Sequence, residues 1–227
     1  VGAASDGRDR SMTAPRPEGQ MRALDRAYAH AGYSPATVGL FEAHGTGTVA
    51  GDQAEVEALA TVLERSGAAT QGSALGSVKS MIGHTKATAG VAGLMKAALA
   101  LHHRVLPPTL GVTRPNPKAD FPHSPLYVNS ETRPWIRSGS HPRRAGVSAF
   151  GFGGTDFHLA LEEYQGDFLG GPAAMVGRMP AELLIWRGNS RGDLTTAVDG
   201  LLAQLDAGAT PSLADLAYSL YLDLPKA

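Results

Sequence analysis

Residues 38–51 read VGLFEAHGTGTVAG, and this stretch decides the fold class. Val38–Ala43 has the length and apolar character of a buried strand, and the strand reaches His44. A glycine-rich turn follows at Gly45–Gly51. Asp52 is a good N-cap, and apolar residues recur after it at helical spacing. The stretch therefore predicts strand, turn and helix in succession, which is typical of an α/β sheet.

The same alternation continues on both sides of this stretch. A helix at 17–32 precedes it, and residues 1–18 before that helix read as a polar loop. Pro107–Pro108 ends a second, alanine-rich helix. Strands are predicted at 74–79, 126–129, 145–150 and 156–162, and helices at 52–63 and 85–104. The last two strands are close enough to pair as an antiparallel hairpin, and the order as a whole predicts an α/β protein with a mostly parallel sheet.

The composition changes near residue 165. Residues 165–180 are rich in Gly, Ala and Pro and read as a linker. A small appended α/β unit is predicted after it, with a strand at 182–186 and helices at 193–205 and 212–222. The predicted organisation is a main domain at 1–164, a linker at 165–180 and the beginning of a further unit at 181–227.

Composition excludes several classes of function. The formal net charge is -1, so no global basic field is present to hold nucleic acid or an anionic membrane. The chain has no cysteine and therefore supplies no disulfide, Cys-ligated zinc or thiolate nucleophile. It opens without an initiator Met or a signal-peptide pattern and has no run of 18 apolar residues. We expect a cytoplasmic fragment of a larger polypeptide.

His44 is the first candidate catalytic residue, because it lies at the carboxyl end of a strand, where α/β folds place functional groups. Thr46 and Thr48 add two hydroxyl groups to the same turn. A hydrogen-bonded structural histidine is the alternative. The turn also fits the dinucleotide pattern G-x-G-x-x-A, but the acidic residue about 20 positions on, Glu64, falls in a helix, and the next strand ends in Lys79. The nucleotide interpretation is therefore disfavoured.

A second group of candidates follows the next strand, where residues 77–84 read SVKSMIGH. His84 is expected at the start of the long helix, whose dipole would favour a neutral imidazole. Such a ring can donate a hydrogen bond to a developing oxyanion. Lys79 could adjust this site electrostatically. A surface lysine and a capping histidine are the alternative interpretation.

Residues 150–155, FGFGGT, form the third candidate, an adaptable loop around Phe152 and Gly153. A plain hairpin turn is the alternative. No other histidine has a partner at metal-ligand spacing, so no metal site is expected. Arg143 and Arg144 read as a solvated turn.

Together, the motifs at 42–48, 78–84 and 151–155 resemble the C-terminal half of a β-ketoacyl synthase (ketosynthase) domain of type I polyketide and fatty-acid synthases. The resemblance covers residues 1–163, and residues 181–227 resemble the ketosynthase–acyltransferase linker. It implies a thiolase-like αβαβα sandwich, of which this chain holds the second half. Residues 85–90 and 107–125 resemble iterative synthases of the polyene, enediyne or polyunsaturated-fatty-acid kind.

The resemblance also implies an acyltransferase reaction, the decarboxylative Claisen condensation of acyl and malonyl thioesters. His44 and His84 would stabilise the enolate and assist decarboxylation, with Lys79 supporting the His84 end. Thr46 and Thr48 would bind the phosphopantetheine arm, and Phe152, with Gly153 beside it in the loop, would gate access to the nucleophile. The chain itself would bind no cofactor, because an acyl carrier protein delivers the phosphopantetheine.

The implied partners are the N-terminal half of the ketosynthase, the acyl carrier protein, an acyltransferase domain and a second copy in a homodimer. The sequence departs from the family at Asp156, where Asn is usual, and the family's nucleophilic cysteine would lie upstream. A non-catalytic structural or dimerisation piece and a decarboxylase-only domain remain open as alternatives.

Overall fold

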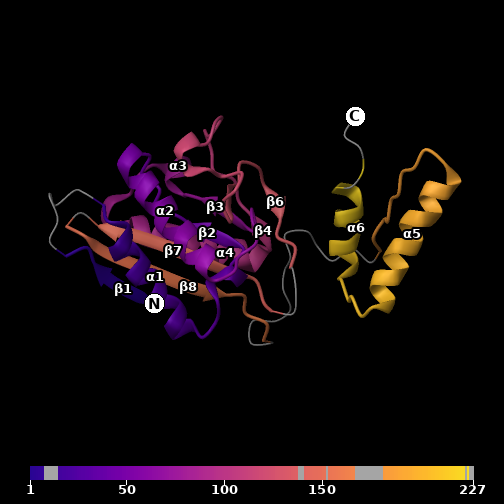
Figure 1. Cartoon of the computed structure of the whole chain (residues 1–227), viewed down its shortest axis with the longest axis horizontal. Coiled ribbons are helices and arrows are strands. Elements are labelled where there is room, and N and C mark those ends of the chain that lie inside the picture. The colour runs from indigo at the N-terminus through magenta and orange to yellow at the C-terminus, as the bar shows by residue number, and fades with distance from the viewer. Residues whose placement is uncertain (8–14, 138–140, 152, 167–180, 223, 225–227) are drawn as a thin grey trace. The chain divides into compact units, whose positions relative to one another are not determined.

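The computed structural model describes residues 1–7, 15–137, 141–151, 153–166, 181–222 and 224 (Figure 1). The chain divides into two compact units, Val1–Pro172 and Ala173–Ala227. The described part of the chain contains no helix that is both long enough and apolar enough to cross a membrane.

A six-stranded mixed sheet organises the first unit, in the order β1-β8-β7-β2-β3-β5. Its strands are β1 (Gly2–Ser5), β2 (Leu40–Glu42), β3 (Ser73–Gly76), β5 (Leu126–Val128), β7 (Arg144–Gly151) and β8 (Thr155–Glu162). Strands β7, β2, β3 and β5 run parallel, and β8 pairs antiparallel with both β7 and β1. The predicted hairpin and the mostly parallel sheet are confirmed.

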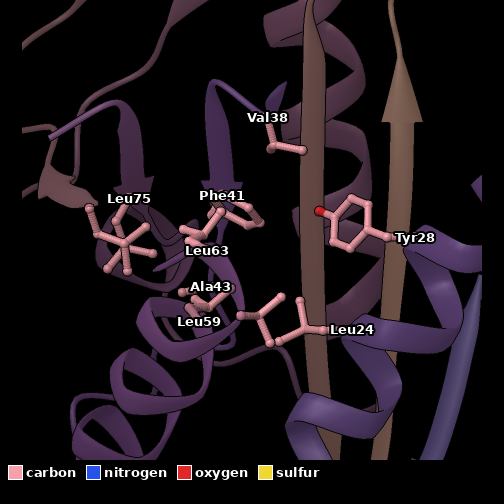
Figure 2. Close-up of a cluster of buried hydrophobic side chains, with 10 residues drawn as sticks. Leu24, Tyr28, Val38, Phe41, Ala43, Leu59, Leu63 and Leu75 are labelled. Carbon is pink, nitrogen blue, oxygen red and sulfur yellow. The ribbon is translucent and has the colours of Figure 1, made fainter. Parts of the chain in front are cut away.

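Helices cover both faces of this sheet, because successive residues of each strand point to opposite sides. Phe41 and Leu75 pack with α1 (Pro17–Ala31) and α2 (Val49–Arg65), as Figure 2 shows. Leu40 and Ala74, their neighbours along the strands, pack on α4 (Ala89–His103) on the other face. The unit is thus a three-layer α/β/α arrangement.

Short elements complete the first unit. These are α3 (Lys79–Ile82), the 3-10 helices η1 (Pro35–Thr37), η2 (Lys86–Thr88) and η3 (Pro117–Ala119), and a small sheet of β4 (Val105–Leu106) with β6 (Arg133–Pro134).

The structure corrects the expectation that residues 1–18 form a loop, because Gly2–Ser5 is an edge strand. It pairs with β8 in the register Gly2 with His158. A Cβ at Gly2 would lie 2.0 Å from the backbone oxygen of Ala23, so β1 approaches α1 as closely as only glycine allows. The small residues of this strand show no apolar and polar alternation, which is why the sequence pattern does not reveal it.

Three predicted boundaries are also wrong. Helix α2 begins at Val49, and its N-cap is Thr48, which accepts a hydrogen bond from the Gly51 N–H (3.2 Å). Strand β3 ends at Gly76, so Lys79 begins α3 instead of ending a strand. Helix α4 begins at Ala89. His84 therefore lies in the loop before it and not in its first turn.

The second unit contains α5 (Arg191–Asp206) and α6 (Leu213–Leu222) within its described residues. Ser190 and Asp193 form a capping box at the start of α5. The strand predicted at 182–186 is not formed, because no other strand of this unit's described part is available to pair with it.

Candidate active site

His44 follows the end of β2 by two residues, and a buried carboxylate from α2 holds the backbone at this point. Glu55 accepts the N–H groups of His44 (2.7 Å) and Gly45 (2.9 Å) through its two oxygens. Burial raises the pKa of Glu55 to about 7, although these two backbone hydrogen bonds oppose the shift. Glu55 was not among the predicted site residues. Its signal in the sequence is a charged residue within the apolar stripe of the helix, beside Ala54, Ala58 and Leu59.

His84 is held in one tautomer by its own loop. Its Nδ1 accepts the Lys86 N–H at 3.0 Å, so this nitrogen carries no proton. In the neutral ring the proton is then on Nε2, which leaves an N–H donor for a bound group. This contact is consistent with the predicted role of His84 as a neutral hydrogen-bond donor. The tautomer is fixed by the backbone N–H of Lys86, the first residue of η2, and not by the dipole of α4.

The structure brings the two histidines together. Their ring centroids lie 5.6 Å apart with the rings nearly perpendicular, at 88°. Phe150 packs beside His44 with a centroid distance of 5.7 Å. Burial is the main cause that lowers the pKa of His44 to about 4, followed by the positive charge of Lys79 and the proximity of His84. His44 is therefore a neutral imidazole near pH 7, and its buried Nδ1 has no hydrogen-bond partner among the described residues.

Lys79 acts on the pair through its charge. It is half-buried at the start of α3 and is not among the residues that line the cavity in front of the histidines. Burial lowers its pKa, while the carboxylates of Glu55 and Glu42 oppose that shift. A positive charge near His44 favours the neutral ring and would stabilise negative charge that develops in the cavity.

A cavity of about 960 Å³ opens in front of both rings. Thr46 and Thr48 line it and lie within hydrogen-bond distance of one another, with their hydroxyl oxygens 3.2 Å apart. Its remaining wall is largely apolar and includes Val91, Leu94, Ala149, Phe150 and Leu159. Gly153 has a φ of +90°, which suits a tight glycine loop, but it does not line the cavity. Phe152 lies outside the described residues.

A pair of acids lies at another part of the cavity wall. A Cβ built on Gly19 would be 2.0 Å from Asp6 Oδ1 and 2.6 Å from Asp156 Oδ2, so these two oxygens are at most 4.6 Å apart. Burial raises the pKa of Asp156 to about 7, and the charge of Asp6 and a hydrogen bond with Asp6 add to the effect. At neutral pH Asp156 is thus substantially protonated and able to donate a hydrogen bond, as an Asn side chain would.

One other predicted feature, the solvated Arg143, is wrong, and a further histidine is structural. Arg143 is not solvated: it is buried and contacts both carboxylate oxygens of Glu163 (3.1 and 3.2 Å). His158 is fully buried between Tyr28 and Ser148, at 3.0 Å from each hydroxyl. No group of three or more His, Asp or Glu side chains within the described ranges is arranged to hold a metal ion.

Comparison with known proteins agrees with this fold. Residues 1–113 match the family described as "Beta-ketoacyl synthase, C-terminal domain". The ketosynthase from module 6 of the bacillaene synthase of Bacillus subtilis superimposes with a TM-score of 0.70 and 39% identity, over 96% of this chain and 37% of the other. The chain belongs to the β-ketoacyl synthase family, and its fold is the thiolase-like fold of the ketosynthases.

The curated relatives are polyketide synthases and a fatty acid synthase. The chain is 48% identical over 164 residues to polyketide synthase PksL of Bacillus subtilis, covering 72% of this chain and 4% of that protein. It is 41% identical over 217 residues to a phenolphthiocerol/phthiocerol polyketide synthase of Mycobacterium tuberculosis, covering 95% and 11%. A polyunsaturated fatty acid synthase of Thraustochytrium is 40% identical over 211 residues, covering 90% and 7%. The chain thus spans about a tenth or less of the length of these relatives.

Proposed function

We propose that this chain supplies the decarboxylating half of a ketosynthase that condenses acyl and malonyl thioesters in a type I polyketide synthase. The observation that carries the proposal is the histidine pair. The rings of His44 and His84 line one cavity, and their centroids lie 5.6 Å apart. His44 is held neutral, and the proton of the neutral His84 ring is fixed on Nε2. Such a pair provides N–H donors for the oxygen of an enolate.

In the proposed reaction, the bond between the malonyl α-carbon and its carboxylate breaks, and CO₂ leaves. The electron pair becomes an enolate whose oxygen accepts hydrogen bonds from His44 and His84. The α-carbon then attacks an acyl thioester on a cysteine, a carbon–carbon bond forms, and the cysteine leaves as a thiolate. That cysteine must come from outside this chain, because the chain contains none.

The other predicted residues fit supporting roles in this reaction. Thr46 and Thr48 line the cavity and would hydrogen-bond the phosphopantetheine arm, which an acyl carrier protein delivers. Lys79 would stabilise negative charge that develops in the cavity. Phe152, with Gly153 next to it, would gate the path to the nucleophile.

An exposed apolar stripe on α4 supports the proposal that the N-terminal half of the ketosynthase packs against this chain. Val91, Met95 and Leu99 recur at helical spacing and are 55%, 60% and 53% exposed, while the opposite face of α4 packs on β7. We propose that the N-terminal half of the ketosynthase covers this stripe and contributes the cysteine.

The proposal also includes an acyltransferase domain and a second copy of the ketosynthase in a homodimer as partners, and a cytoplasmic location. Iterative use stays a prediction, since both polyketide and fatty-acid synthases match.

A decarboxylase-only domain is the second candidate. A decarboxylase needs the histidine pair but no cysteine, and this chain has the histidine pair and no cysteine. A silent structural or dimerisation piece would need neither.

The test uses the complete ketosynthase that carries this chain, with malonyl-loaded acyl carrier protein and an acyl donor. We expect His44→Ala and His84→Ala to abolish CO₂ release. Full CO₂ release by both variants would refute the assigned roles. CO₂ release without a condensed product would favour the decarboxylase, and the absence of both reactions in the wild type would favour the structural piece.

A further inference from the structure

Glu42 places a buried carboxylate where the sheet otherwise presents apolar side chains to α4. It is 1% exposed, and it lies on the same face of β2 as Leu40, which belongs to the apolar cluster under α4. A buried charge destabilises a fold unless it is paired and hydrogen-bonded. Both oxygens of Glu42 are in fact engaged.

The two carboxylate oxygens of Glu42 bind one residue before and one residue after the loop that carries His84. Oε1 accepts the N–H of Val78 at 2.5 Å, just before α3. Oε2 accepts a hydrogen bond from Lys96 Nζ at 2.8 Å, two turns into α4, where the lysine side chain is 9% exposed. Residues 78 and 96 enclose the loop of His84, and Glu42 itself precedes His44 by two positions.

Close packing keeps this carboxylate in place. A Cβ at Gly93 would lie 3.1 Å from Glu42 Cγ and 3.4 Å from Val147 Cγ1, so the glycine lets α4 approach β2 around the acid. A Cβ at Gly76 would lie 3.5 Å from Lys96 Nζ, which shows that the ammonium group reaches the end of β3. The ion pair therefore joins β2, the end of β3 and α4.

We propose that Glu42, paired with Lys96, is a positioning residue that sets the distance and angle between His44 and His84. The inference rests on the proposed function, in which both rings must reach one enolate oxygen. Apolar contacts allow α4 and the 78–84 loop to slide on the sheet, whereas a carboxylate with two directed partners fixes their register. A small misplacement of catalytic groups lowers the rate steeply.

The test compares two double variants of the complete ketosynthase, because either single substitution would leave a buried charge unpaired. Glu42→Met/Lys96→Met removes both contacts. Glu42→Gln/Lys96→Met keeps a carbonyl oxygen for the Val78 N–H and removes only the contact with α4. We expect the first to lower kcat for malonyl decarboxylation about tenfold or more with KM nearly unchanged, and the second to lower it about threefold.

The matched control is Arg143→Met/Glu163→Gln, which removes another buried ion pair that does not line the cavity and keeps a carbonyl oxygen for the Nε–H of Arg104 at the end of α4. We expect it to lower thermal stability without changing kcat per folded molecule. A second measurement, the ¹⁵N spectrum of the histidine rings, is expected to shift for His44 and His84 in the Glu42 variants and to stay unchanged in the control.

A folded Glu42→Met/Lys96→Met variant with wild-type kcat and unchanged histidine signals would overturn the inference. If that variant does not fold, Glu42→Gln/Lys96→Met decides, and wild-type kcat and signals there have the same consequence. Failure of the proposed function is distinguishable, since the wild-type enzyme would then release no CO₂ or would keep releasing it without His44 and His84.

Discussion

Asp156→Asn is the most informative single substitution for the stability of the cavity wall. Asp156 and Asp6 are both buried acids with oxygens at most 4.6 Å apart, and the pKa of Asp156 is raised from 3.8 to about 7. An acid with a raised pKa in the folded state stabilises the fold while it is protonated. This stability is fully present below the unfolded pKa near 3.8 and is lost as pH rises through about 7.

The size of this effect follows from the shift. Each pKa unit corresponds to about 1.4 kcal/mol, which gives a ceiling of about 4 kcal/mol between pH 4 and pH 8. Water that enters the cavity screens the pair, so we expect about 2 kcal/mol. The amide introduced by Asp156→Asn does not titrate and would donate a hydrogen bond to Asp6 throughout this pH range. The variant is therefore expected to exceed the wild type by about 2 kcal/mol at pH 8 and to lose this advantage toward pH 5.

The assay is chemical denaturation of the complete ketosynthase between pH 5 and pH 8.5, with the difference between variant and wild type as the measured quantity. The difference is needed because the lowered pKa values of His44 and His158 change stability in the opposite direction, as pH falls through about 6.5. Glu57→Gln, an exposed acid on α2, is the matched control. A stability difference for Asp156→Asn that stays constant across this range would refute the reasoning.

Three further predictions concern the framework of the site. Gly2→Ala is expected to lower the free energy of unfolding by about 1–3 kcal/mol, because its Cβ would meet backbone atoms of α1, and hydrogen exchange is expected to rise in β1. Arg143→Met leaves the buried Glu163 with Arg104 as its ionic partner and is expected to cost about 1–3 kcal/mol in urea unfolding, whereas exposed Arg137→Met is nearly neutral. Glu55→Gln places an amide NH₂ group against one of the two backbone N–H donors and is expected to lower the free energy of unfolding by about 1–3 kcal/mol. It is also expected to shift the ¹⁵N signals of His44, and unchanged signals would contradict the positioning role of Glu55.

The mostly parallel sheet could be predicted because its signals are local, whereas the pairing of His44 with His84 was implied by the resemblance to the ketosynthases. An apolar run ending at a histidine and a glycine turn marks a strand end, and two such ends in neighbouring parallel strands meet at one edge of the sheet. The structure pairs β2 in parallel with β3, and His44 and His84 lie in the segments that follow these strands.

The groups that hold the histidines could not be predicted in the same way, because their roles depend on pairings distant in the sequence. Glu55 reads as one charged residue in a helix until its carboxylate meets the backbone of His44. Glu42 and Lys96 are 54 residues apart, and their contact depends on the packing of α4 on β2. Arg143 reads as solvated because its partner, Glu163, lies 20 residues further along the chain, beside it only once β7 and β8 have paired.

Charge placement around the site follows from these distant contacts. Glu55 and Glu42 bind backbone N–H groups at the ends of β2 and β3, so each acid fixes one of the two segments that carry a histidine. Lys79 lies where both carboxylates act on it, and its own charge helps to lower the pKa of His44. The acids therefore orient the backbone, and the lysine adds to burial in keeping His44 neutral. Because His44 is already neutral near pH 7, no proton has to leave its ring before the site can stabilise a negatively charged oxygen.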